Sequence, residues 1–289
     1  MSAPQILTGL AQAADRYDAI LCDVWGVLHN GVDSFAEAAG ALQRFQEARG
    51  PVVLISNSPR PSQDVIAQLH ALLVPDSAWS AFVTSGDVTR DLLAERAPGP
   101  AWDIGPNRDG TLYEGLGLSL VEGPEDAAFI SCTGLTNDET ETPEDYRSAL
   151  ERAARRGLMM VCANPDLIVQ RGSRMIYCGG ALAALYETLG GTVIMAGKPH
   201  APIYERARKD ADRLAGRPLD PARILAIGDG APTDVLGANR QNLDCLFIAD
   251  GIHAAEASGA DGRLDAARLE AVLTKGGVQA AYALAGLVW

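Results

Sequence analysis

The sequence predicts an α/β fold in which helices cover both faces of a mostly parallel, doubly wound sheet. Three observations support this prediction. Short apolar runs lack polar alternation, as strands buried on both faces do. Segments with apolar residues at helical spacing lie between these runs. Several runs end directly in polar residues and glycines, and open α/β sheets gather their functional groups at such strand ends.

The first hundred residues alternate between the two patterns. Helical spacing predicts helices over 5–16, 35–45, 63–73 and 88–96. Buried strands are predicted over 19–22, 52–55 and 81–84. The first strand ends at Asp23, and the second ends at Ser56 and Asn57. These polar residues therefore follow strands at the positions where a parallel sheet places its chemistry.

A change of composition at 97–100, Ala-Pro-Gly-Pro, predicts a domain boundary. We expect residues 1–98 and 193–289 to form one domain and residues 99–192 to form an inserted α/β domain. Inside the insertion the patterns predict strands over 127–131 and 158–162 and helices over 143–156 and 180–189. After it they predict strands over 192–195, 224–227 and 244–248 and helices over 203–215 and 264–273.

Composition narrows the class of protein. The 289 residues carry a net charge of −13 without a Lys/Arg cluster, which disfavours nucleic acid as a partner. Five cysteines without a C-x-x-C pair indicate reduced thiols rather than disulfides or zinc ligands. The amino terminus has no export signal, and no apolar run reaches membrane-spanning length. We therefore expect a cytoplasmic protein with no membrane partner.

Polar groups at four strand ends suit phosphoryl transfer. Asp23 follows one strand, Ser56 another, Lys198 a third, and Asp229 and Asp234 a fourth. Carboxylates can hold Mg²⁺, which prefers oxygen ligands, and one carboxylate can attack phosphorus. A lysine and a hydroxyl can orient the phosphoryl oxygens and neutralise their charge.

Four ordered motifs carry a resemblance to a known family. They are Asp-Val-Trp-Gly-Val-Leu at 23–28, Ile-Ser-Asn at 55–57, Gly-Lys-Pro at 197–199 and Gly-Asp-Gly-Ala-Pro-Thr-Asp at 228–234. The chain resembles the haloacid dehalogenase-like (HAD) hydrolase superfamily over nearly its whole length. Within that superfamily it is most similar to the subclass IIA, or NagD-type, phosphatases, which act on sugar phosphates, nucleotides and related small phosphoesters.

The resemblance implies a Rossmann-like HAD core and an inserted, mobile α/β cap of the C2 type. It also implies Mg²⁺ as cofactor, a small phosphorylated metabolite as substrate and a homodimer that pairs through the cap. Ser56 would hydrogen-bond the transferring phosphoryl group, helped by the backbone of Asn57. Asn164 and Asp166 would lie on the substrate-facing side of the cap and bind substrate.

The remaining family roles concern the charged residues. Asp23 would be the nucleophile and a Mg²⁺ ligand, and Asp229 would be the other direct carboxylate ligand. Asp234 would bind the metal through water and orient Lys198. Lys198 would pair with Asp23 and with the phosphate, which would keep the nucleophile ionised.

Trp25 departs from the family pattern. Phosphatases of this family usually carry a second aspartate there, which acts as general acid and base. The metal ligand from that position is a backbone carbonyl, which Trp25 still supplies. General acid–base catalysis typically contributes about 10²–10⁴ in rate, so three outcomes stay open: substrates with good leaving groups, a substitute acid, or a binding protein with residual activity. His29 is the nearest titratable substitute, although an exposed loop histidine is the plainer interpretation.

Two other functions compete with a Mg²⁺-dependent phosphatase. A metal-independent haloacid dehalogenase also attacks through one aspartate and has an aromatic residue at the position of Trp25. It would not need Asp229 and Asp234 as metal ligands. A non-catalytic binding protein would keep the metal and phosphate pocket after losing the acid. Phosphate release from phosphorylated metabolites would separate these functions.

Overall fold

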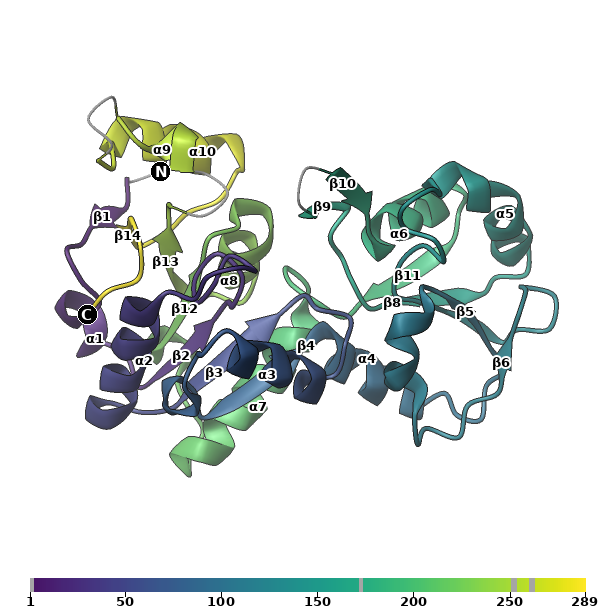
Figure 1. Cartoon of the computed structure of the whole chain (residues 1–289), viewed down its shortest axis with the longest axis horizontal. Coiled ribbons are helices and arrows are strands. Elements are labelled where there is room, and N and C mark those ends of the chain that lie inside the picture. Colours follow the sequence, from purple (N-terminus) through teal and green to yellow (C-terminus); the bar gives the residue numbers. More distant parts are fainter. Residues whose placement is uncertain (1–2, 172–173, 251–253, 260–262) are drawn as a thin grey trace. The chain divides into compact units, whose positions relative to one another are not determined.

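The computed structural model describes residues 3–171, 174–250, 254–259 and 263–289. The chain divides into two compact units, each with its own sheet (Figure 1). Unit 1 contains the described parts of Met1–Ser56, Ile66–Val83 and Lys198–Trp289. Unit 2 contains Asn57–Val65 and the described parts of Thr84–Gly197.

The described residues of the chain form a seven-stranded sheet in unit 1 with the order β1-β14-β13-β12-β2-β3-β4. Its strands are β1 (Gln5–Ile6), β2 (Ala19–Cys22), β3 (Val52–Ser56), β4 (Ala81–Thr84, whose last residue clusters with unit 2), β12 (Ile224–Gly228), β13 (Asp244–Ile248) and β14 (Tyr282–Leu284). The five pairings from β1 to β3 along this order are parallel. Every residue of β2, β3 and β12 is buried, as their unbroken apolar sequences predict.

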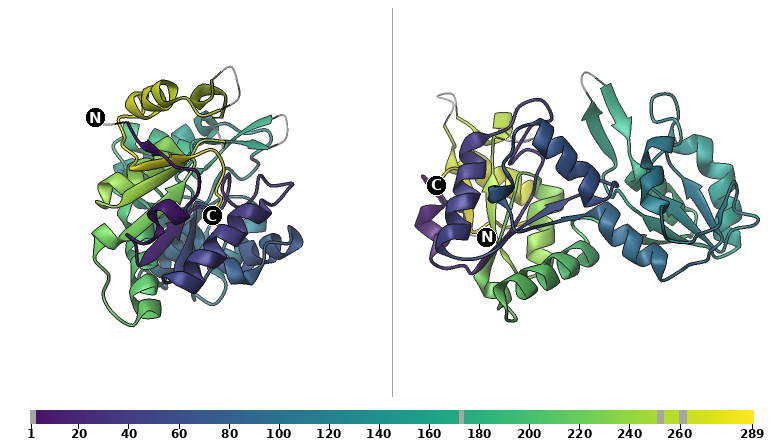
Figure 2. Two further views of the ribbon diagram at one scale, coloured as in Figure 1. Left: turned by 90° about the vertical axis from the view of Figure 1, so that its left-hand side faces the viewer. Right: turned by 60° about the horizontal axis from the view of Figure 1, so that its bottom comes forward.

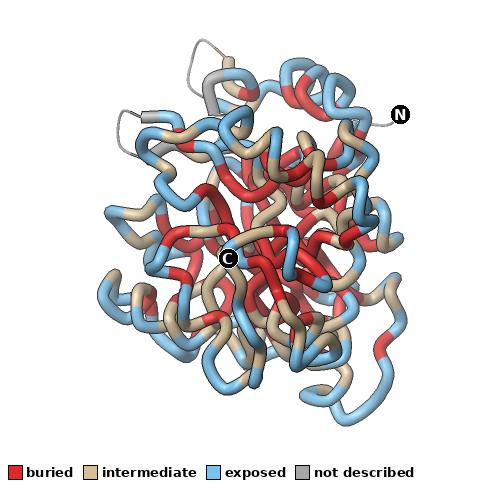
Figure 3. Tube along the Cα trace, turned by 90° about the vertical axis from the view of Figure 1, so that its right-hand side faces the viewer, coloured by how far each residue is buried: buried red, intermediate tan, exposed pale blue. Residues whose placement is uncertain are grey.

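Helices cover both faces of this sheet, and Figure 2 shows α2 and α7 on opposite sides of it. The helical segments of unit 1 are α1 (Ala11–Ala14), α2 (Ala36–Ala48), η1 (Asp76–Ala78), α7 (Ala201–Ala215), η4 (Pro221–Arg223), η5 (Ala231–Val235), α8 (Leu236–Arg240), α9 (Ala254–Ala257) and α10 (Ala266–Lys275). Helix α3 (Ser62–Ala71) begins in unit 2 and continues in unit 1. Leu42 and Phe45 of α2 join the apolar core that includes Ile20 and Leu54. Figure 3 shows how buried positions alternate with exposed ones along the chain.

Unit 2 contains a parallel sheet with the order β11-β8-β7-β5-β6. Its strands are β5 (Ala101–Ile104), β6 (Leu120–Val121), β7 (Phe129–Cys132), β8 (Met159–Cys162) and β11 (Thr192–Met195). Strands β9 (Ile168–Arg171) and β10 (Arg174–Tyr177) form a separate antiparallel pair. The helical segments are α4 (Ser85–Ala94), η2 (Asn107–Tyr113), η3 (Pro143–Tyr146), α5 (Arg147–Arg155) and α6 (Gly179–Thr188).

The structure differs from the sequence prediction near the amino terminus. Residues 5–16 form strand β1 and the short helix α1 instead of one helix, because β1 pairs with β14 from the far end of the chain. Unit 2 takes in Asn57–Val65 and the described parts of Thr84–Gly197, and α4 packs there against η2 and β8; that residues 99–192 form an inserted domain stays a prediction. Leu93 of α4 is buried with Leu112 and Phe129 of unit 2. That this unit is a mobile cap stays a prediction.

Candidate active site

The candidate site begins where β2 and β12 end. The backbone N–H of Asp23 donates to the carbonyl of Ile227 over 2.8 Å, which extends the β2–β12 pairing beyond Cys22. The chain leaves β2 toward β3 and leaves β12 toward β13, on the other side. The crevice between β2 and β12 is therefore the topological switch point, where open α/β sheets bind their ligands.

Lys198, just before α7, supplies the positive charge of the site. Its Nζ atom lies 2.5 Å from Oδ1 of Asp23 and 2.8 Å from Oδ1 of Asp234. All three residues are buried, with exposed fractions of 2%, 7% and 3%. Burial by itself lowers the pKa of Lys198, but the nearby charges of Asp23 and Asp234 outweigh it and raise that pKa. The ammonium group therefore stays charged at neutral pH.

Asp234 is held from several sides. Its Oδ1 accepts from Lys198, and its Oδ2 accepts from the backbone N–H of Gly230 over 3.0 Å and from the Thr233 hydroxyl over 3.2 Å. A Cβ atom on Gly228 would lie 2.2 Å from Cγ of Asp234, so only glycine leaves room for this carboxylate. With both oxygens engaged, Asp234 suits the predicted role of orienting Lys198 and the waters of a metal.

Gly26 makes room for the second metal-ligand candidate. It has φ of +77°, and a Cβ atom there would lie 2.1 Å from Oδ2 of Asp229. The loop after β2 and the loop after β12 therefore touch at a position that tolerates only glycine. In the sequence, Gly26 and Gly228 are noticed only as members of their motifs. That they make room for the carboxylates of Asp229 and Asp234 was not predicted. The available signal was a glycine close to an acidic residue in each motif.

Three carboxylates form a cluster of oxygen ligands. One ligand oxygen each from Asp23, Asp229 and Asp234 lies within 4.8 Å of the others, and all three residues are buried. Burial, and then the charge of Asp234, raise the pKa of Asp23 well above its usual range, against the opposing effect of Lys198. One ammonium thus faces three carboxylates, and a divalent cation would restore neutrality. Hard oxygen donors suit Mg²⁺, so the donor set fits the predicted ion.

The predicted substrate-binding residues fall in both units. Ser56 is buried at the end of β3, next to β2 in unit 1. Asn57 begins unit 2, where its Nδ2 donates to Oδ1 of Asp166 over 3.1 Å. Asn164 accepts a 3.1 Å hydrogen bond from the backbone N–H of Asp166, which closes the turn after β8. The structure thus brings Asn57 and Asp166 together and gives Asn164 a role in shaping their turn.

Trp25 exposes its ring on the loop after β2. The residue is 54% exposed, and a Cβ atom on Gly31 would lie 2.6 Å from Cζ2 of the indole. The indole packs edge-on against the ring of His29, with centroids 5.6 Å apart. The position at which the family resemblance implies an acid therefore presents an apolar ring to solvent.

His29 holds this loop in shape. It is 1% exposed, and its Nδ1 accepts from the backbone N–H of Gly31 over 2.9 Å. Burial lowers its pKa, so the ring is neutral at physiological pH. The expectation of an exposed loop histidine is wrong. His29 is instead a buried residue that shapes the Trp25 loop, because its ring fits between the indole and the Gly31 backbone.

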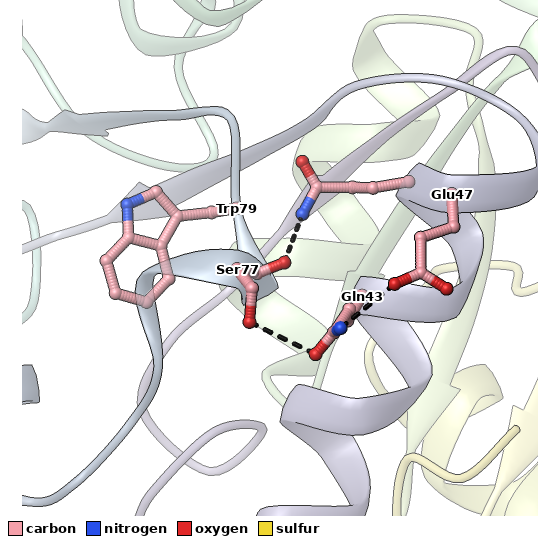
Figure 4. A pocket seen from close by; sticks show the side chains of 5 residues that line it. Gln43, Glu47, Ser77 and Trp79 are labelled. Atoms are coloured by element: carbon pink, nitrogen blue, oxygen red, sulfur yellow. Dashed lines mark hydrogen bonds between the residues drawn. The ribbon is translucent and has the colours of Figure 1, made fainter.

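A separate surface hollow of about 330 Å³ lies over α2 and η1 (Figure 4). Its polar side chains bind one another: Gln43 donates to Glu47, Ser77 donates to Gln43, and Gln46 donates to the Ser77 carbonyl. Trp79 completes the lining. Because these groups satisfy one another, the hollow offers little to a polar ligand.

Comparison with known proteins decides the family. Residues 20–119 match a family model described as haloacid dehalogenase-like hydrolase, and residues 195–281 match a second, described as HAD-hydrolase-like. A solved hydrolase of the haloacid dehalogenase-like family from Brucella suis 1330 is 48% identical, with a TM-score of 0.83 over 98% of this chain and 100% of that one. The chain belongs to the haloacid dehalogenase-like hydrolase family. The predicted fold class is thereby confirmed.

Curated relatives of this HAD chain are phosphatases. The 5'-nucleotidase YutF of Bacillus subtilis (strain 168) is 24% identical over 238 residues, which are 82% of this chain and 88% of that protein. The ribonucleotide monophosphatase NagD of Escherichia coli (strain K12) is 24% identical over 238 residues, covering 81% and 88%. They confirm the resemblance to NagD-type proteins and the predicted class, an HAD-type phosphatase. Within the described ranges, no helix of this chain is long and apolar enough to cross a membrane.

Proposed function

We propose that this HAD protein is a Mg²⁺-dependent hydrolase of small phosphomonoesters that forms an aspartyl-phosphate on Asp23. The observation that carries the proposal is the buried contact between Lys198 and Asp23, at a sheet edge that also presents Asp229 and Asp234. Phosphoryl transfer needs a nucleophile and groups that neutralise the phosphoryl oxygens, and this set provides both.

Each charged residue of the site has its own role in the proposed reaction. Asp23, Asp229 and the backbone carbonyl of Trp25 would hold Mg²⁺ directly, and Asp234 would hold it through water; the bound ion would neutralise phosphoryl charge. An Asp23 oxygen attacks phosphorus, and the bond to the leaving oxygen breaks with its electron pair. Water then attacks the aspartyl-phosphate and gives a proton to the solvent, and the P–O bond to Asp23 breaks to give phosphate and the free carboxylate. Lys198 orients Asp23 throughout.

Binding of the substrate is assigned to four polar residues. Ser56 donates to the transferring phosphoryl group, which its buried place beside β2 supports. Asn57, Asn164 and Asp166 contact substrate, and the Asn57–Asp166 hydrogen bond supports their acting together. The names of the two curated relatives favour a nucleotide or sugar phosphate. A homodimer that pairs through unit 2 and a cytoplasmic location belong to the same proposal; five free, buried cysteines support the location.

Trp25 determines which leaving groups suit the site. The indole has no proton to give at neutral pH, and the neighbouring His29 is neutral and engaged at Nδ1. The leaving oxygen therefore departs without a proton from this loop, so turnover should rise steeply as the leaving group becomes more acidic. Aryl phosphates should be hydrolysed faster than alkyl phosphates.

A non-catalytic phosphate-binding protein is the second candidate. The exposed ring of Trp25, in the place of a general acid, favours it. A haloacid dehalogenase has less support, because its reaction needs no metal, whereas Asp229 and Asp234 cluster with Asp23 in the manner of metal ligands.

Phosphate release from a panel of phosphorylated metabolites and aryl phosphates, with Mg²⁺, tests these functions. Wild-type protein should release phosphate, Asp23→Asn should be folded and inactive, and the exposed control Asp15→Asn should match wild type. Full activity in Asp23→Asn would refute the proposal. Binding without turnover across the panel would establish the second candidate, and chloride release from 2-haloacids without Mg²⁺ would establish the third.

A further inference from the structure

The sheet of unit 2 has a switch point of its own. Its order is β11-β8-β7-β5-β6, and its neighbouring strands are parallel. The chain leaves β5 toward β6 and leaves β7 toward β8, on the other side. The crevice between the carboxyl ends of β5 and β7 is therefore the topological equivalent of the crevice that holds Asp23 in unit 1. The same rule predicts a ligand there.

A cavity of about 150 Å³ lies at this crevice. The loop after β5 and helix η2 supply most of its lining, and Thr133 after β7 supplies another part. Asp103 and Leu120 complete the wall from one face of the sheet, since Leu120 pairs with Ala101, two residues before Asp103. Among the described residues, those that line the cavity include no lysine, arginine or histidine.

Asp109 is the buried charge of the cavity. It is 4% exposed, and burial raises its pKa above the usual range. The nearby Thr133 hydroxyl and then the charges of Arg108 and Arg60 oppose this effect, and the Arg108 guanidinium also forms an ion pair with Asp138. A cation inside the cavity would stabilise the ionised form of Asp109.

Thr133 adds a second polar group. The residue is 3% exposed, and among the described residues its hydroxyl has no partner in hydrogen-bond geometry, although it lies near enough to Asp109 to favour the carboxylate. A Cβ atom on Gly105 would lie 2.0 Å from this hydroxyl, so glycine leaves the space that Thr133 occupies. The Tyr113 hydroxyl is already paired with Ser131 over 3.0 Å. A buried polar group without a partner is costly, and a bound donor would relieve that cost.

We propose that this cavity binds a small organic cation with a primary ammonium group. An ammonium offers three N–H donors, and Asp109 and Thr133 offer acceptors on one side of the cavity. A divalent metal fits this cavity less well. The group of three carboxylates that could hold a metal among the described residues lies elsewhere, at Asp23, Asp229 and Asp234. A cavity of this volume holds a ligand of roughly six non-hydrogen atoms, the size of benzene. The site is independent of the proposed phosphatase activity.

Calorimetric titration of the full-length protein in EDTA tests the proposal. Ethanolamine and 1,4-diaminobutane are the probes, and 1,4-butanediol is the neutral control. A separate amine titration without EDTA and with saturating MgCl₂ is the inorganic control, because Mg²⁺ held at the carboxylate cluster should leave amine binding unchanged. At least one amine should bind with a Kd on the order of 1 mM, as expected of a ligand with few atoms. Asp23→Asn should bind it equally well, which separates this site from the catalytic one.

Variants locate the site. Asp109→Asn should weaken amine binding at least tenfold, whereas Asp126→Asn, the same change on an exposed residue outside the lining, should not. Gly110→Leu is the second variant, because a Cβ atom on Gly110 meets nothing within 4 Å and a longer side chain can enter the cavity. It should block binding without a change of charge. The proposal is overturned if neither amine binds, if butanediol binds as tightly as the amines, if Mg²⁺ displaces the amine, or if both cavity variants bind as wild type does.

Discussion

Nζ of Lys198 and Oδ1 of Asp23 are 2.5 Å apart, and neither residue is more than 7% exposed. Lys198 is thus the counter-charge of a buried carboxylate cluster as well as a partner of Asp23, the proposed nucleophile. Removing it would leave three carboxylates without compensation, whereas removing Asp23 would relieve part of their repulsion.

Lys198→Met should therefore lose about 3–5 kcal/mol of unfolding free energy at pH 7 in EDTA, the typical cost of breaking a buried ion pair. Urea denaturation measures this loss. Mg²⁺ should recover part of it, because a bound cation replaces the missing charge. Asp23→Asn, measured alongside, should be as stable as wild type or more stable in EDTA. Equal losses in the two variants would contradict this charge balance.

Trp25→Asp should place a proton donor near Asp23, the proposed nucleophile. We expect kcat/KM for alkyl phosphates to rise by about 10²–10⁴, since a poor leaving group needs protonation. Aryl phosphates with acidic leaving groups should gain far less. Steady-state rates over a series of leaving groups test this difference. Trp25→Asn is the matched control, because asparagine is similar in size to aspartate but cannot donate a proton as an acid does. A similar gain in Trp25→Asn would mean that the space left by the indole, and not a proton donor, causes the effect.

Tyr204→Phe should stabilise the protein. Tyr204 is fully buried, and within the described part of the chain its hydroxyl has no hydrogen-bond partner. Removing the hydroxyl should raise the unfolding free energy by about 1 kcal/mol. Tyr186→Phe is the matched variant, because the equally buried Tyr186 donates to the Leu158 carbonyl over 2.5 Å. That change should cost about 1 kcal/mol, and thermal denaturation of both should give opposite signs.

Asp18→Asn should be less stable than wild type at neutral pH, by an amount that decreases in acid. Two hydrogen bonds from Arg223, of 2.7 and 2.6 Å, lower the pKa of Asp18 well below its usual range, with Arg217 assisting and burial opposing. A lowered pKa contributes stability above the unfolded-state pKa of about 3.9, and this is lost as pH falls further. We expect a loss of about 1–2 kcal/mol at pH 7 that shrinks steadily as the pH falls below about 3.9 towards the lower folded-state pKa. The exposed control Asp15→Asn should show no such dependence.

The sequence predicted the interior strands well because their physics is local. The apolar runs of β2, β3 and β12 indicate burial on both faces without further context. Strand β1 could not be found in this way, because its two exposed residues become a strand only by pairing with β14. The boundary predicted at residue 99 followed composition, whereas the packing of α4 within unit 2 depends on side chains that follow it by many residues.

The sequence predicted which charged residues meet at the candidate site, but not which glycines make room for their side chains. The order of the motifs indicated that Asp23, Lys198, Asp229 and Asp234 would meet at one sheet edge, and their side chains do so. The fit of Gly26 against Asp229 depends on two loops separated by most of the chain. Such a contact exists only after folding, so periodicity and composition carry no sign of it.

The pairing of β2 with β12 also has a consequence for synthesis on the ribosome. Residue 19 pairs with residue 224, so the sheet edge that carries Asp23 cannot form until most of the chain has left the exit tunnel. Unit 2, which is drawn largely from residues 84–197, can close its own sheet earlier. A nascent chain truncated before β12 should therefore contain a folded unit 2 without the sheet edge that positions Asp23, and the proposed hydrolysis should begin only after β12 has emerged.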